Sequence, residues 1–236
     1  MKTETVEYKE GSTVLEGFAA YADSGKHPGV VVVPEWNGVG DYTKKRAQML
    51  AELGYNAFVA DIYGKGIRPT TMEACAAEMQ KYATNRPLLR ARARAALEQL
   101  RKLPNTDTGK LAAMGYCFGG LTVLEMARDG LDLKGVISFH GALNTPNPAD
   151  AKNIKGKVLA LHGADDPVVP DAEVLAFQKE MRDAKVDWSF VAYGNAVHTF
   201  TNWNVPEGTP GPAAYNKKAD QRSWTAMQDF FKEIFA

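Results

Sequence analysis

The stretch Gly115-Tyr116-Cys117-Phe118-Gly119-Gly120 decides the fold of this chain. It follows the apolar run Leu111-Ala112-Ala113-Met114 and precedes a helical pattern of apolar residues that begins at Leu121. This order predicts a strand, a tight turn and a helix. The glycines around Cys117 let the strand fold straight back into a helix, which strains the cysteine backbone and projects its side chain above the sheet. The pattern is that of a nucleophile elbow with cysteine in place of serine.

The same stretch also fits a structural explanation. Small residues occur where a helix packs tightly on a strand, and a free cysteine is among the most buried residue types. The catalytic explanation adds that the N–H of Phe118 lies at a helix N-terminus, where the positive end of the helix dipole suits a developing oxyanion. The rest of the chain has to decide between the two.

Composition excludes several classes of function. The chain has 236 residues, with 28 Lys and Arg against 28 Asp and Glu, so no net charge attracts nucleic acid or an anionic membrane. No apolar run reaches the length of a membrane span, and the N-terminus shows no signal segment, so we expect a cytoplasmic protein. The two cysteines fit neither a disulfide framework nor a metal site. We expect one domain over residues 1–236 with no metal or cofactor, as a monomer or homodimer.

Hydrophobic patterning predicts an α/β protein. Alternation over residues 3–9 and 12–20 indicates an antiparallel N-terminal hairpin. The β-branched run at 29–33 is typical of a strand buried on both faces. Further strands are expected at 56–60, 111–114, 135–139, 158–161 and 188–193, and helices at 42–53, 71–82, 87–103, 171–184 and 214–235. This alternation predicts a mostly parallel sheet with helices on both faces.

Polar residues follow several of these predicted strands. In a parallel sheet the carboxyl ends of the strands meet at one edge, which is where reactive groups gather. The residues that fall there are Glu35, Cys117, His140, Asp165, Asp166 and His198. The sequence therefore predicts a site at this edge.

A catalytic cysteine needs a partner that forms or stabilises its thiolate, and histidine is the usual one. Of the four histidines, only His198 lies between the last strand and the last helix. The chain order nucleophile, acid, histidine is that of α/β-hydrolases. Asp165 and Asp166 are both candidates for the acid, and either carboxylate might instead cap the helix that follows. His140 and His162 each precede a glycine, and we interpret them as turn or supporting residues.

Four motifs give the chain a family resemblance. Val31-Val32-Val33-Pro34-Glu35, the 115–120 stretch, Asp166-Pro167-Val168-Val169-Pro170 and Ala196-Val197-His198-Thr199-Phe200 occur in the order seen in dienelactone hydrolases (carboxymethylenebutenolidases). The chain resembles this branch of the α/β-hydrolase fold over nearly its whole length. The resemblance implies a triad of Cys117, His198 and Asp166. It also implies that Glu35 contacts the resting thiol, and that the N–H groups of Trp36 and Phe118 form the oxyanion hole.

The chain departs from the family where the substrate is held. Dienelactone hydrolases bind a substrate carboxylate with arginines, one of them shortly after the catalytic histidine, and the run 198–203 contains none. Arg68 and Arg86 are the candidates that remain for this role. Tyr63 and Trp203 are expected to line an aromatic pocket together with Trp36 and Phe118. Uncharged esters are therefore favoured over carboxylated lactones.

The predicted function is hydrolysis of small ester or lactone substrates through an acyl-thioester on Cys117. The alternative at the same site is hydrolysis of neutral organophosphate triesters. A thiol-dependent redox enzyme is disfavoured because no Cys-x-x-Cys motif occurs. A non-catalytic binding protein is disfavoured because it has no need of the complete set of Cys117, Asp166 and His198.

Overall fold

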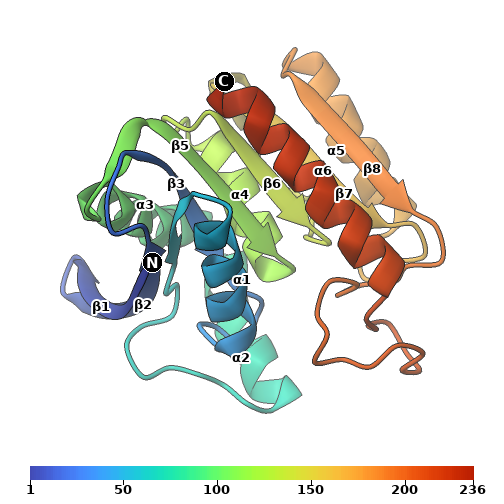
Figure 1. Ribbon diagram of the computed structural model, residues 1–236. Helices are drawn as coiled ribbons and strands as arrows, with labels where there is room; N and C mark the ends of the chain where they lie inside the picture. The colour runs from blue at the N-terminus through green and yellow to red at the C-terminus, as the bar shows by residue number, and fades with distance from the viewer. The chain divides into compact units, whose positions relative to one another are not determined.

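Buried β-branched residues form one of the strands of the N-terminal half. Val30 to Val33 are fully buried in β3 (His27–Val33), as expected for a strand covered on both faces. The computed structural model describes residues 1–236. It contains two compact units, Met1–Met114 and Gly115–Ala236, and Figure 1 colours the chain along its length. One domain over residues 1–236 stays a prediction.

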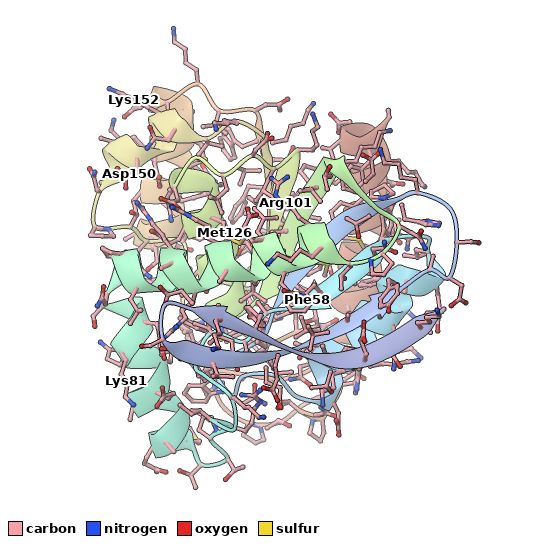
Figure 2. All side chains as sticks on the ribbon, turned by 90° about the vertical axis from the view of Figure 1, so that its left-hand side faces the viewer. Phe58, Lys81, Arg101, Met126, Asp150 and Lys152 are labelled. Carbon is pink, nitrogen blue, oxygen red and sulfur yellow. The ribbon has the colours of Figure 1, made fainter.

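The first unit begins with the predicted hairpin. β1 (Lys2–Glu10) pairs antiparallel with β2 (Thr13–Tyr21), with Glu10 opposite Thr13. Gly11 takes a φ of 55° in the turn, a conformation that glycine adopts without steric cost. Figure 2 shows the twisted hairpin in front, with α3 (Arg86–Lys102) alongside it. The hairpin prediction is confirmed.

The remaining elements of this unit follow the predicted alternation of strand and helix. β4 (Asn56–Val59) pairs antiparallel with β2 and parallel with β3. The helices α1 (Asp41–Glu52) and α2 (Met72–Ala83) also occur where they were predicted. β5 (Thr106–Tyr116) is longer than its apolar core, because its first five residues are partly exposed and lack a hydrophobic signal. Its last two residues belong to the second unit.

The second unit contains three parallel strands. β6 (Gly135–Phe139), β7 (Lys157–Gly163) and β8 (Trp188–Tyr193) are paired in that order. They alternate with α4 (Phe118–Arg128), α5 (Asp171–Asp183) and α6 (Lys217–Phe235). A short 3-10 helix, η1 (Pro148–Asn153), was not predicted. All three predicted strands and the 171–184 helix are confirmed.

Helices cover both faces of these strands. A Cβ atom on Gly135 would lie 2.7 Å from Cζ of Phe230 in α6, whereas one on Gly120 of α4 would lie 2.5 Å from Oγ of Ser138. Gly135 and Ser138 are three residues apart in β6, and side chains alternate between the faces of a strand. Therefore α6 and α4 pack on opposite faces, as Figure 1 shows with α6 in front of β6 and α4 behind it.

The last helix begins later than predicted. We expected it from residue 214, but it starts at Lys217, because the Asn216 side chain caps it by accepting the N–H of Ala219 at 3.0 Å. Ala214 instead donates its N–H to the carbonyl of His198 at 3.1 Å. Neither this 19-residue helix nor any other is long and apolar enough to cross a lipid bilayer.

A buried ion network fixes the far end of α4. Arg128 is fully buried and forms two 2.8 Å bonds with the carboxylate of Glu180 in α5, through Nε and Nη2. It also contacts Glu125 at 3.1 Å and donates to the carbonyl of Leu143 at 2.8 Å. Such a group is costly to bury unless all its partners are present. The network therefore ties α4, which begins directly after Cys117, to α5 and to the segment after β6.

We expect Arg128→Met to lower the free energy of unfolding by about 3–5 kcal/mol, because it leaves two buried carboxylates without their cation. Urea unfolding followed by circular dichroism measures the loss. Arg222→Met, on the exposed surface of α6, is the matched control and should change stability by less than about 0.5 kcal/mol. Equal effects of the two substitutions would show that the network is not a structural anchor.

Candidate active site

The turn at Cys117 has the strained geometry that the sequence predicts. Cys117 takes φ 53° and ψ −113° and directly precedes α4. A Cβ atom on Gly115 would lie 2.1 Å from the carbonyl oxygen of Gly119, so no other residue fits there without moving the backbone. The N–H of Phe118 is the first amide of α4, at the positive end of the helix dipole. The chain therefore places the thiol at a helix N-terminus through backbone constraints alone.

His198 lies between Cys117 and Asp166. Its Nε2 is 3.1 Å from Sγ of Cys117, and its Nδ1 is 2.8 Å from Oδ2 of Asp166. Both His198 and Asp166 are buried. The other carboxylate oxygen, Oδ1, accepts the N–H groups of Val168 and Val169 at 2.8 and 3.3 Å. The structure brings these three predicted residues together in one hydrogen-bonded array.

The structure also resolves the choice between the two aspartates. Asp165 is exposed, and its N–H donates to the carbonyl of Ala196 at 3.0 Å. The 163–166 and 196–198 segments touch because Gly163 has no side chain, since a Cβ there would lie 2.5 Å from the oxygen of Ala196. Asp166, and not Asp165, faces the imidazole of His198.

Backbone hydrogen bonds hold His198 from both sides. Its N–H donates to the carbonyl of Pro212 at 3.1 Å, and its own carbonyl accepts the N–H of Ala214. The N–H of Asn216 likewise donates to the carbonyl of Phe200 at 3.0 Å. The segment between β8 and α6 therefore closes on the residues next to the imidazole.

The surroundings of His198 favour its charged form. Burial lowers its pKa, but the negative charge of a Cys117 thiolate and the hydrogen bonds to Asp166 and Cys117 outweigh burial and raise the pKa of His198 from 6.5 to about 10. A raised pKa stabilises the fold fully below the ordinary value of 6.5, and this contribution is lost as the pH rises through about 10. The His198 ring is therefore an imidazolium at neutral pH.

Four other predicted residues, Glu35, Trp36, Tyr63 and Arg68, lie in the first unit. Glu35 and Trp36 follow β3 in a turn closed by a 3.0 Å bond from the N–H of Gly38 to the carbonyl of Glu35. The Tyr63 hydroxyl donates to the carbonyl of Trp36 at 2.7 Å, and Tyr63 is only 2% exposed. Arg68 donates to the carbonyls of Glu16, Gly64 and Ile67. The polar atoms of Tyr63 and Arg68 thus bind backbone carbonyls of nearby loops. These bonds compete with the substrate contacts that were predicted for the same atoms.

The last two predicted substrate contacts differ in exposure. Trp203, in the segment after His198, is 38% exposed and is the one large aromatic residue among the exposed hydrophobic side chains. Arg86 is buried at the start of α3. Trp203 can therefore meet a ligand from solvent, whereas Arg86 lies beneath the surface.

Two polar residues near the array carry roles that the sequence does not specify. His140 and Thr201 are buried, and His140 accepts the N–H of Cys117 on Nδ1 at 3.2 Å. The position of His140 directly after a strand is a usable signal, whereas nothing in the sequence marks Thr201.

His162 lies with its ring 5.4 Å from that of Phe190, and burial lowers the pKa of its imidazole.

We expect His198 to remain protonated at neutral pH and to lose its proton near pH 10. Asp166→Asn removes one of the two partners and should move this titration toward lower pH. NMR of the imidazole ring signals across pH 5–11 measures both. Asp165→Asn is the matched control, and it should leave the midpoint unchanged because Asp165 is exposed and does not contact the ring. A wild-type midpoint near 6.5 would contradict the ion pair.

Comparison with known proteins places this geometry in a family. The family model described as "Dienelactone hydrolase family" matches residues 15–235. A relative from Methylorubrum extorquens, provisionally named a carboxymethylenebutenolidase, is 27% identical over 222 residues, which cover 90% of this chain and 74% of the relative.

Two solved structures are more similar. One, named m3DLH, is 41% identical, with a TM-score of 0.95 over 100% of this chain and 99% of the other. The second is described as a dienelactone hydrolase-like promiscuous phosphotriesterase from metagenomic libraries. It is also 41% identical, with a TM-score of 0.94 over 99% of this chain and 98% of the other. These matches confirm the predicted α/β-hydrolase fold and the hydrolase class. The chain belongs to the dienelactone hydrolase family.

Proposed function

We propose that the protein hydrolyses small, uncharged esters or lactones, with Cys117 as nucleophile, His198 as acid and base, and Asp166 as the group that orients His198. The contacts of His198, 3.1 Å to Sγ of Cys117 and 2.8 Å to Asp166, are the single observation that carries the proposal. The first distance allows proton transfer between Cys117 and His198, and the second lets Asp166 fix the orientation of the ring. Family membership makes a hydrolase the expected setting for them.

The first half of the reaction forms a thioester. The Cys117 thiolate attacks the carbonyl carbon, and the N–H of Phe118 stabilises the negative oxygen of the tetrahedral intermediate. The intermediate collapses by breaking the carbon–oxygen ester bond, and the His198 imidazolium gives its Nε2 proton to the departing alkoxide. The products are an alcohol, an acyl-thioester on Cys117 and a neutral His198. The roles of Glu35 as thiol partner and of the Trp36 N–H as second oxyanion donor remain predictions from the family resemblance.

The second half uses His198 in the opposite sense. Once Cys117 carries an acyl group, the thiolate charge that raised the pKa of His198 is gone, while burial still lowers it. Neutral His198 therefore takes a proton from water as that water attacks the thioester. Collapse then releases the acid and restores the thiolate beside the imidazolium. The loss of one neighbouring charge thus changes His198 from acid to base.

We expect Cys117→Ala to reduce hydrolysis of p-nitrophenyl acetate by at least ~1,000-fold, because no nucleophile remains. Release of p-nitrophenol measured at several pH values gives the rate, and mass spectrometry of the wild type after rapid quenching should detect an added acetyl group. Cys75→Ala is the matched control: Cys75 is the other cysteine, buried in α2, and its loss should leave the rate unchanged. Equal activity of the Cys117 variant and the wild type would refute the proposal.

Neutral organophosphate triesters are a second candidate substrate class. The observation in favour is the likeness to the promiscuous phosphotriesterase, at 41% identity and a TM-score of 0.94. The run 198–203 also has no arginine to demand a substrate carboxylate. In this reaction the thiolate attacks phosphorus, the aryloxide leaves, and water then releases the dialkyl phosphate from Cys117.

We expect measurable turnover of paraoxon that disappears in Cys117→Ala, because both reactions need the same thiolate. Absorbance of released p-nitrophenol gives the rate, and competition by phenyl acetate, which releases no p-nitrophenol, should inhibit it. Turnover that is confined to carboxylated lactones would exclude this candidate and the preference for uncharged substrates together.

A further inference from the structure

His140 occupies an unusual backbone position at the end of β6. It is fully buried and takes a φ of 41°, in the left-handed region that few residues other than glycine adopt. Histidine, asparagine and aspartate are the residue types enriched there. Such a conformation persists only where the surroundings hold it, and it often occurs at functional sites.

Both ring nitrogens of His140 are engaged. The N–H of Cys117 points to the carbonyl of Phe139 at 3.0 Å and to Nδ1 of His140 at 3.2 Å. A backbone N–H can only donate, so Nδ1 is an acceptor and carries no proton. The proton of the neutral imidazole is therefore on Nε2, which lies 2.7 Å from Oγ1 of Thr201 and donates to it.

The two partners of His140 belong to opposite sides of the array. Cys117 is the proposed nucleophile, whereas Thr201 lies three residues after His198. Thr201 is in a turn that is closed by the 2.9 Å bond from the N–H of Asn202 to the carbonyl of Thr199. The His140 ring also packs edge-on against the ring of His198, with centroids 5.4 Å apart at 67°. It meets the ring of Phe200 at 5.1 Å and 81°. One side chain thus contacts both segments that form the Cys117–His198 contact.

We infer that His140, as the neutral tautomer protonated on Nε2, is a positioning residue that holds Cys117 and His198 in register through the N–H of Cys117 and the hydroxyl of Thr201. The inference rests on the proposed function. Because Nδ1 accepts and Nε2 donates, His140 does not take the thiol proton, which leaves His198 as its acceptor. A shift of the thiol relative to His198 lowers the rate of the chemical step more than it lowers substrate affinity.

Two substitutions at His140 separate its two contacts. In His140→Asn, the amide oxygen takes the place of Nδ1 and keeps the bond to Cys117, and asparagine tolerates a positive φ. In His140→Gln, the amide nitrogen takes the place of Nε2 and keeps the bond to Thr201, but the side-chain acceptor for the Cys117 N–H is lost and only the Phe139 carbonyl remains. Thr201→Val removes the hydroxyl at similar volume, and Thr201→Ser restores it.

The test measures kcat and KM with p-nitrophenyl acetate, the rate of Cys117 alkylation by iodoacetamide, and urea unfolding for all four variants. We expect kcat to fall ~10–100-fold in His140→Gln and in Thr201→Val, with KM within ~3-fold of the wild type. Thr201→Ser should recover kcat to within ~3-fold. His140→Asn should lose less activity than His140→Gln. Alkylation should slow in parallel with kcat, a change that a loss of stability alone does not cause in a folded protein.

Folded His140→Gln and Thr201→Val with wild-type kcat and alkylation rates would overturn the inference. If His140→Gln does not fold, the Thr201 pair decides: recovery by serine supports the inference, and equal kcat values for valine and serine overturn it. Cys117→Ala in the same assay separates the two proposals. Full activity of that variant refutes the proposed function, whereas its inactivity beside fully active His140 and Thr201 variants refutes only the role of His140.

Discussion

The backbone strain at Cys117 is the constraint on which the rest of the second unit depends. A cysteine at φ 53° is unfavourable, and it is held there because the neighbouring backbone leaves no alternative. Gly115 lets the first turn of α4 pass within contact of the strand, and Gly120 lets the same helix approach Ser138 in β6. At its other end α4 is fixed by the buried Arg128 network. Packing, turn geometry and buried charge therefore fix the backbone of one residue, Cys117, whose side chain is only partly buried.

In the proposed reaction, electrostatics gives the constrained thiol its reactivity. The array contains two negative groups and one positive group when Cys117 is a thiolate, and the positive group lies between them. Asp166 is itself held by two backbone N–H groups, so it fixes the Nδ1 side of the ring and leaves Nε2 to exchange a proton in the proposed reaction. Because the ring is buried, each change of charge on the sulfur strongly changes the pKa of the imidazole. This electrostatic effect does not depend on the net charge of the chain, because it comes from three neighbouring side chains.

Much of this arrangement follows from the sequence. The parts that could not be predicted from it have one physical cause in common. The glycine spacing around Cys117 and the chain order of Asp166 and His198 predict the array, because they depend on short motifs placed at strand ends. The choice between Asp165 and Asp166 depends on which side of one turn faces inward, and adjacent residues carry almost the same local signal. Tyr63 and Arg68 were expected to face a substrate, yet their polar atoms serve nearby carbonyls, which depends on tertiary contacts between loops. The pairing of His140 with Thr201 joins residues 61 positions apart and has no local signature.

The segment after His198 is anchored at both ends, so its sequence and length can change without moving the imidazole. Bonds at Pro212, Ala214 and Asn216 bring the chain back to the residues beside the imidazole, so the stretch between them forms a side loop with anchored ends. The entropic cost of a longer loop grows slowly with its length. Insertions, deletions or exchanges around the exposed Trp203 can therefore remodel the surface near the imidazole while the anchors keep its position. For the proposed hydrolase, this makes the loop the place where we expect evolution, or a directed library, to change specificity without moving the imidazole.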